Sequence, residues 1–218
     1  MPSAPSLPLP VIVPLGDSGL LVRFGDSLSE AANAAALAFA QHAEAAALPG
    51  VTEIVPNLVS VLLRYDPRQI GFDRLAGEVR LLMGGDRAAV TGAEHRIEMR
   101  YDGEDLAEVC DLLGLTEAAF VAAHGATPLR VLAVGFAPGF LYCGFHPQEL
   151  HVPRRSLVRP PLAAGTVLFA AGQTAITATP VPTGWHVIGH TGLRNFDPTA
   201  TVPVRVRAGD TVTFGAVS

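Results

Sequence analysis

The first third of the chain alternates between short apolar runs and segments with helical spacing. Runs rich in valine, isoleucine and leucine predict four strands, at 11–14, 20–24, 51–55 and 59–65. Between the second and third strands, Ser27-Leu28-Ser29-Glu30 has the form of a capping box and predicts the start of an alanine-rich helix. Pro49-Gly50 predicts where that helix ends.

A second helix is predicted from residue 72 to residue 83. Leu75, Val79 and Leu82 recur at nearly helical spacing, and Gly84-Gly85 follows as a terminator. The order ββαββα predicts an α+β domain over residues 1–86, with an antiparallel sheet and two helices on one of its faces. The polar, glycine-punctuated stretch 87–94 predicts a linker.

The pattern from residue 95 to residue 218 predicts a mainly-β domain. It opens with a strand at 95–101, helices at 104–113 and 116–124, and an apolar strand at 129–136. Thereafter glycines and prolines recur between short β-rich runs, at 167–170, 175–179, 185–188, 202–206 and 211–214. Short strands with such punctuation are typical of a β-barrel with long loops, which the last two runs should close.

Length and composition indicate a cytoplasmic protein. The chain of 218 residues has no apolar stretch long enough for a membrane span, and its proline-broken start does not resemble a signal peptide. Cys110 and Cys143 show neither close pairing nor metal-site spacing, as expected in a reducing compartment.

All fifteen basic residues are arginines. A Walker A loop needs a lysine, and Schiff-base chemistry needs an amine, so this chain alone can supply neither. Charge is also unevenly divided: residues 1–125 hold seventeen acidic residues and eight arginines, whereas residues 126–218 hold three acidic residues and seven arginines. The C-terminal half is therefore expected to receive an anionic group. Nucleic acid is not expected, because the arginines are sparse and lack interleaved aromatic residues.

Four segments place polar or aromatic residues beside glycine. They are Gly135-Phe136-Ala137-Pro138-Gly139-Phe140, Pro153-Arg154-Arg155, Ala171-Gly172-Gln173-Thr174 and the run 184–190, GWHVIGH. Glycine lets backbone N–H groups approach a ligand, so such loops bind anions without lysine. Any one segment alone is better explained by glycines that only turn corners in a barrel, and it is the occurrence of all four within about 60 residues that favours a site.

In their order along the chain, these segments resemble a known family. GFAPGFLYCGF, VPRRSLVRPPLAAGTVLFAAGQTA and PTGWHVIGHTGLRNFDP are similar to the family variously called allophanate hydrolase subunit 1, the B-type subunit of 5-oxoprolinase and sporulation kinase inhibitor KipI. They are also similar to part of the carboxyltransferase domain of urea carboxylase. PLGDSGLLVRFGD and YDGEDLAEVCDLLGL extend the likeness over nearly the whole chain.

The resemblance implies a cyclophilin-like barrel in the C-terminal domain and a partner of carboxyltransferase type, called subunit 2 or, in 5-oxoprolinase, the C-type subunit. In the 5-oxoprolinase version, a third, A-type subunit completes the ATP-dependent opening of 5-oxoproline to L-glutamate. We therefore expect a B-type 5-oxoprolinase subunit that is inactive alone and acts on a small anionic lactam or amide. A component of an allophanate- or urea-processing system, and a KipI-like inhibitor of a histidine kinase, stay open as alternatives.

The candidate site residues lie in the four segments. Arg154 and Arg155 can present planar donor forks to a carboxylate or phosphoryl oxygen, and Gln173 with Thr174 can hydrogen-bond both sides of an amide. We expect Gln173, Thr174 and Arg155 to act in catalysis. The expected substrate-binding residues are Arg154, Phe140, Gly139, Trp185, His186 and His190.

Two features bear on substrate and metal. The family pattern leads us to expect Gly-Arg-Thr where the chain has Gly189-His190-Thr191, and a mostly neutral imidazole makes a weaker anion clamp than arginine. His186 and His190 would share one side of a regular strand, but no third ligand has suitable spacing, so no metal is expected. Cys143 is expected to be a small buried residue and Asp197 to cap a turn.

Overall fold

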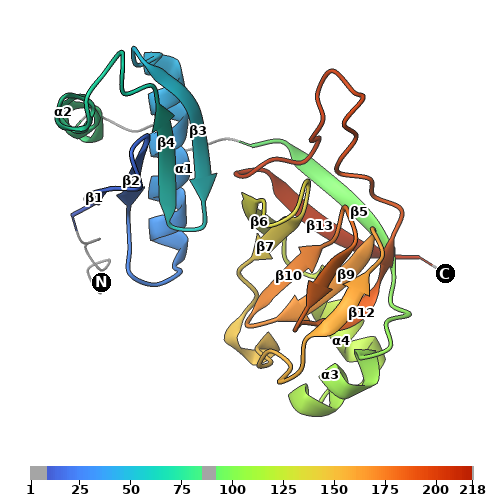
Figure 1. Ribbon diagram of the computed structural model, residues 1–218. Coiled ribbons are helices and arrows are strands. Elements are labelled where there is room, and N and C mark those ends of the chain that lie inside the picture. Colours follow the sequence, from blue (N-terminus) through green and yellow to red (C-terminus); the bar gives the residue numbers. More distant parts are fainter. Residues whose placement is uncertain (1–8, 85–91, 218) are drawn as a thin grey trace. The chain divides into compact units, whose positions relative to one another are not determined.

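The structure, a computed structural model, describes residues 9–84 and 92–217, which fall into two compact units on either side of residue 91 (Figure 1). Of the predicted linker 87–94, residues 87–91 lie outside the described part, and the first strand of the second unit already begins at Glu94. No helix within the described ranges combines the length and apolar character that crossing a membrane requires.

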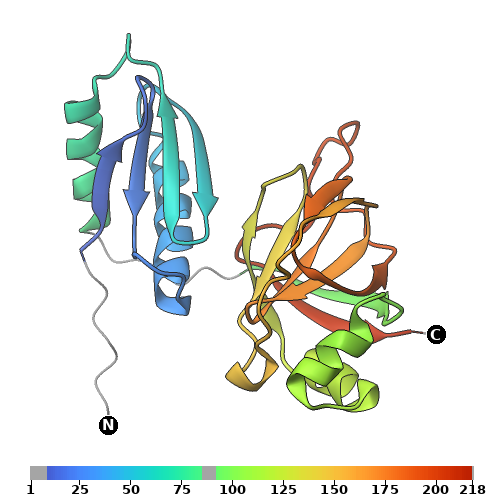
Figure 2. The same cartoon turned by 60° about the horizontal axis from the view of Figure 1, so that its bottom comes forward.

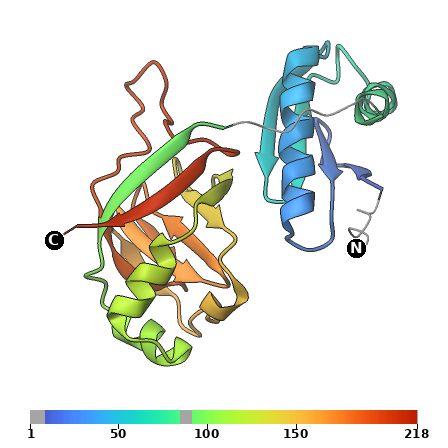
Figure 3. The same cartoon turned by 180° about the vertical axis from the view of Figure 1, so that it is seen from behind.

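The N-terminal unit is a four-stranded antiparallel sheet with two helices. Its elements are β1 (Val11–Pro14), β2 (Gly19–Arg23), α1 (Glu30–Ala46), β3 (Val51–Asn57), β4 (Ser60–Tyr65) and α2 (Phe72–Met83), and the strand order is β1-β2-β4-β3. Leu20, Val22 and Leu63 of the sheet are fully buried in one cluster with Phe39 of α1 and Leu75 of α2. Figure 3 shows α1 lying across one face of this sheet.

The start of α1 differs from the prediction by two residues. Ser29, not Ser27, is the N-cap, and its Oγ accepts a hydrogen bond from the Ala32 N–H at 3.2 Å. Both serines precede the helix closely enough to cap it, so the sequence signal alone could not select between them. The helix ends before Pro49-Gly50 as predicted, with Ala47 in the left-handed conformation at φ 46°.

The C-terminal unit is a closed barrel with two helices. The barrel order is β10-β7-β6-β13-β5-β12-β9. These strands are β5 (Glu94–Arg100), β6 (Leu129–Val134), β7 (Leu141–Gly144), β9 (Thr166–Ala170), β10 (Gln173–Ile176), β12 (His186–Thr191) and β13 (Thr211–Ala216). A separate ribbon joins β8 (Arg159–Leu162) to β11 (Val181–Thr183), and Gln148–Leu150 form a 3₁₀ turn, η1. The helices α3 (Leu106–Leu113) and α4 (Glu117–Gly125) lie together at one end of the barrel (Figure 2).

The predicted barrel is confirmed, but it closes differently from the prediction. β5 runs parallel to β13 from Glu94 to Met99, and residues 202–206 do not form a strand. Within that run only Val204 makes a bridge, to Phe196. Pro203 has no N–H to donate to a strand ladder, which explains why the apolar pattern did not become a strand.

Alternation along the strands creates an inner and an outer apolar cluster. On β9, Val167 and Phe169 belong to the inner core, whereas Leu168 and Ala170 belong to the outer cluster. The β8–β11 ribbon contributes Val181 to the outer cluster, so β9 is buried on both faces. Double burial explains why 167–170 is continuously apolar in the sequence.

Candidate functional site

The outer cluster carries a row of aromatic side chains and one arginine, which we call the aromatic cluster: Phe140, Tyr142, Trp185 and Arg154. The Phe140 and Tyr142 ring centroids lie 4.8 Å apart, and those of Tyr142 and Trp185 lie 6.0 Å apart. The Arg154 guanidinium lies 5.5 Å from the Trp185 ring centroid, within cation–π range. Arg154 is exposed and makes no ion pair within the described part of the chain. Three predicted substrate-binding residues therefore lie in one place.

Gly139 shapes the loop that leads to Phe140. Its φ of 69° is in the left-handed region, and a Cβ there would lie 2.7 Å from the Cβ of Phe196. The Asn195 side-chain amide donates to the Gly139 carbonyl at 3.1 Å. Backbone conformation and close packing therefore explain why position 139 is a glycine. Its contact with substrate stays a prediction.

Gln173 and Thr174 point to opposite sides of β10. Thr174 pairs with Cys143 of the inner core, whereas Gln173 lies beside Gly144, where an added Cβ would be 3.7 Å from its Nε2. Gln173 is 5% exposed, and its Nε2 has no hydrogen-bond partner among the described residues. The sequence suggested that both side chains bind the same amide. Because they lie on opposite sides of the strand, they cannot both contact a ligand that lies on one side.

Thr174 belongs to a buried network that the sequence did not predict. Its Oγ1 lies 2.8 Å from His124 Nε2 and 2.8 Å from His146 Nε2, and His124 Nδ1 lies 2.8 Å from the Tyr101 hydroxyl. The two imidazole rings stack with centroids 4.9 Å apart. Because a hydroxyl has one hydrogen, Thr174 donates to one histidine and accepts from the other.

Burial keeps both histidines of the network neutral. Desolvation, together with the neighbouring His146, lowers the pKa of His124 well below its usual value, and desolvation lowers the pKa of His146 to about 4. Burial also raises the pKa of Tyr101 to about 12. His124 and His146 lie 22 positions apart in no recognisable motif, so the sequence carried no signal for this network.

Arg155 is committed to carboxylates of the α3 region. Its Nη1 lies 2.8 Å from Asp105 Oδ1 and 2.6 Å from Glu108 Oε2. Arg159 pairs with the same Asp105 and with Glu104. Asp105 is 4% exposed, and its Oδ2 accepts the Val187 N–H at 2.7 Å. In the structure, Arg155 links the loop that carries it to the start of α3 through these ion pairs. Its expected part in catalysis stays a prediction.

His186 and His190 have separate environments. A bulge in β12 between Val187 and Gly189 breaks the regular alternation. His186 is buried with Nε2 3.0 Å from the Pro153 carbonyl, whereas His190 Nδ1 lies 2.7 Å from Asp102 Oδ1. Across residues 9–84 and 92–217, no three histidine, cysteine or acidic side chains gather as metal ligands would.

Two minor predictions are confirmed. Cys143 lies fully buried on β7, and burial raises the pKa of its thiol to about 12. Asp197 Oδ1 accepts the N–H and the hydroxyl of Thr199, at 2.9 and 2.7 Å, as a turn-capping carboxylate does.

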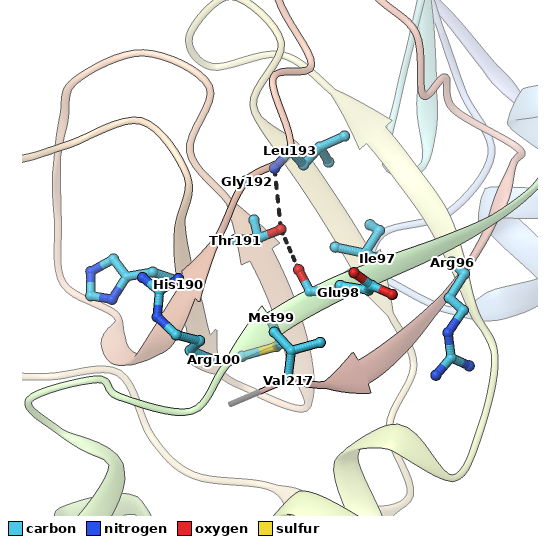
Figure 4. Close-up of a pocket in the computed structure, with 10 residues that line it drawn as sticks. All are labelled: Arg96, Ile97, Glu98, Met99, Arg100, His190, Thr191, Gly192, Leu193 and Val217. Atoms are coloured by element: carbon cyan, nitrogen blue, oxygen red, sulfur yellow. Dashed lines mark hydrogen bonds between the residues drawn. The ribbon is translucent and has the colours of Figure 1, made fainter.

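His190 borders a hollow of about 480 Å³ between β5 and the end of β12 (Figure 4). Arg96, Glu98 and Arg100 line it from β5, and Thr191 and Leu193 line it from the other side. Of the predicted site residues, only His190 borders this hollow.

Comparisons with known proteins agree with the architecture. The family model "Carboxyltransferase domain, subdomain C and D" matches residues 10–206. The B-type subunit of 5-oxoprolinase from Bacillus subtilis (strain 168) is 32% identical over an alignment 224 positions long, which covers 94% of this chain and 91% of that protein.

Two groups of solved structures are also similar. TTHA0988 superimposes with a TM-score of 0.81 at 38% identity, covering 92% of this chain; this chain spans only 40% of that one. The urea amidolyase of K. lactis superimposes with a TM-score of 0.74 at 14% identity, over 96% of this chain and 15% of that one, and shows the fold alone. With a family model that matches most of its length and a relative of this identity, the chain belongs to the family of carboxyltransferase-domain subdomains C and D.

Proposed function

We propose that this chain is the B-type subunit of an ATP-dependent 5-oxoprolinase complex, which opens 5-oxoproline to L-glutamate. The observation that carries the proposal is the similarity to the B-type 5-oxoprolinase subunit of Bacillus subtilis over nearly the full length of both chains. The word "subunit" in that protein's name implies further subunits. We propose a carboxyltransferase-type protein, the C-type subunit, and an A-type subunit in the role of these partners.

The aromatic cluster supports a site for a small anionic lactam. The exposed Arg154 guanidinium is free to pair with the substrate carboxylate, and Trp185 beneath it offers an apolar wall. We assign Gln173 as an amide donor to the lactam carbonyl, because its buried Nε2 has no partner within the described residues. Thr174 takes no direct part in this assignment, since two histidines already occupy its hydroxyl.

ATP binding is assigned to another subunit in this proposal. The chain has no lysine and therefore no Walker A loop. Arg155 and Arg159, the arginines next to the aromatic cluster in sequence, are already paired with Asp105. This chain would contribute substrate contacts, and it would show no turnover when isolated.

The test is turnover by the reconstituted complex. This chain would be co-purified with the A-type and C-type subunits, and release of L-glutamate from 5-oxoproline would be measured with and without ATP. We expect glutamate release only when ATP and the full set of subunits are present. Absence of release, together with turnover of allophanate, would instead support the allophanate-processing alternative, with which the carboxyltransferase family model is also consistent.

Substitutions at Arg154 of the aromatic cluster and at Gln173 test the assignment of residues. We expect Arg154→Ala to raise KM about tenfold with a smaller change in kcat, because a charged hydrogen bond to bound substrate contributes roughly 1.5–3 kcal/mol. Gln173→Ala should lower kcat/KM by a similar factor. Arg194→Ala, at another exposed arginine, is the matched control. Unchanged kinetics in both test variants would remove Arg154 and Gln173 from the site.

A further inference from the structure

The hollow beside His190 lies along the edge of β5 that faces β12, and only part of this edge is paired with β12. β12 pairs with β5 opposite Met99 and Arg100 and then ends at Thr191. The Thr191 side chain takes over at this point: its Oγ1 donates to the Glu98 carbonyl at 2.6 Å and accepts the Leu193 N–H at 3.2 Å. Figure 4 shows both contacts at the border of the hollow.

Alternation along β5 shows which peptide groups face the hollow. The carbonyls of Ala93 and Met99 accept N–H groups from the β13 side, at 2.9 and 3.0 Å, whereas the Glu98 carbonyl accepts from Thr191 on the opposite side. Peptide groups of successive strand residues point to alternate edges, so those of Arg96 and Glu98 both face the hollow. Within residues 9–84 and 92–217, the Arg96 N–H and C=O and the Glu98 N–H have no strand partner.

The side chains along this edge alternate in charge. Arg96 and Glu98 are exposed, and neither forms an ion pair in the described part of the chain. A strand placed beside β5 would set its own side chains directly opposite these two, where opposite charges are favourable. The matching segment would carry an acidic and a basic residue two positions apart, with the acidic one facing Arg96.

We propose that an extended segment of the carboxyltransferase-type partner binds as an added strand to the edge of β5 at Arg96 and Glu98. That segment would carry an acidic residue opposite Arg96 and a basic residue opposite Glu98. The inference rests on the proposed function for the identity of the partner. Main-chain hydrogen bonds to the open edge supply the attachment, and the charge pair selects the segment. The hollow, about 480 Å³ in volume, offers the space.

Residue-resolved amide exchange tests the added strand directly. We expect the Arg96 and Glu98 amides to exchange at least tenfold more slowly once the partner subunit is bound. The Ile97 and Met99 amides face β13 and serve as internal controls that are slow in both states. Unchanged amide exchange rates at Arg96 and Glu98 within a formed complex overturn the inference. Exchange that becomes slower as the concentration of this chain alone rises also overturns it, because a second copy would then occupy the edge.

Variants test the same edge through affinity. Arg96→Pro removes an N–H that faces the hollow and costs no bond to β13, so we expect at least tenfold weaker partner binding by an otherwise folded chain. Ile97→Pro, one position along, removes an N–H that faces β13 and should destabilise the barrel. Arg96→Glu would weaken binding to a comparable extent through charge alone, with Arg68→Glu in the N-terminal unit as the matched control. Partner affinity within twofold of wild type for Arg96→Glu and for a folded Arg96→Pro overturns the inference.

The two proposals fail in different ways. A complex that turns over 5-oxoproline while the Arg96 and Glu98 amides exchange freely leaves the proposed function intact and removes the added strand. A wild-type chain that binds no carboxyltransferase-type protein removes both.

Discussion

At the residue scale, the buried histidine–threonine network is the feature with the clearest physical signature. His124 and His146 are neutral inside the barrel because water is excluded, and each uses Nε2 to reach the same hydroxyl. Protonating either ring would put a charge in the core beside a second imidazole. The barrel's stability should therefore depend on pH in a range where exposed carboxylates are still ionised.

The expected pH dependence has a definite sign. Burial lowers the pKa of His146 to about 4 from 6.5, so the unfolded state binds more protons than the folded state below pH 6.5. Stability should fall as pH drops from 6.5 towards 4, by up to about 3 kcal/mol from His146 alone. Urea unfolding of the second unit at a series of pH values measures this. His146→Asn should make the profile less steep, with the contribution of His124 remaining, whereas His151→Asn, at an exposed histidine, should leave it unchanged.

At the element scale, the α3 region is fastened to the barrel by charge as well as by apolar packing. Asp105, immediately before α3, binds Arg155, Arg159 and the Val187 N–H of β12. Truncating one partner of a buried network leaves the others desolvated without compensation. The loop 153–159 and the start of α3 should therefore loosen together.

Asp105→Asn tests this fastening. We expect a loss of about 3 kcal/mol in the free energy of unfolding, because two arginines would lose their shared charge partner. Glu104→Gln at the exposed end of the same network should cost less than about 1 kcal/mol. Denaturant unfolding measures both, and equal effects from the two variants would show that Asp105 has no special role.

The elements with clear periodicity were the ones that the sequence predicted well. The segments 11–14 and 72–83 coincide with β1 and α2, and 129–136 contains β6. The strands β7, β8 and β11 were missed because Leu141–Gly144, Arg159–Leu162 and Val181–Thr183 are short and rich in glycine or proline. Such strands are specified by their neighbours rather than by local pattern.

The candidate site was predictable only as a set of loops. Phe140, Trp185 and Arg154 come from three of the glycine-bordered segments and lie together in the structure. Spacing could not show that Gln173 and Thr174 lie on opposite sides of β10. The carboxylates that hold Arg155 lie 47 and 50 positions away in the chain, beyond the reach of any local signal.

At the scale of the whole molecule, each unit has a core of its own. The cluster around Phe39 contains only residues of the first unit, and the clusters around Phe169 and Trp185 contain only residues of the second. An independent core is the main requirement for independent folding.

Separate expression tests this independence. Residues 92–218 alone should give a cooperative thermal transition with an exchange-protected barrel, and residues 1–84 should unfold cooperatively on their own. Calorimetry and amide exchange of the two fragments are the measurements. A fragment 92–218 that lacks protected barrel amides would show that its fold depends on the other unit.

The parallel pairing of β5 with β13 has a consequence for synthesis of the chain. The first strand of the second unit, β5, pairs with the last strand of that unit, β13, which follows more than a hundred residues later. The ribosome must therefore synthesise Thr211–Ala216 before the barrel can close. Until then, the backbone groups of β5 and β6 that pair with β13 lack their hydrogen-bond partners. This barrel is expected to close only after β13 has left the ribosome, and chaperones that shield nascent strands would act on it in that interval.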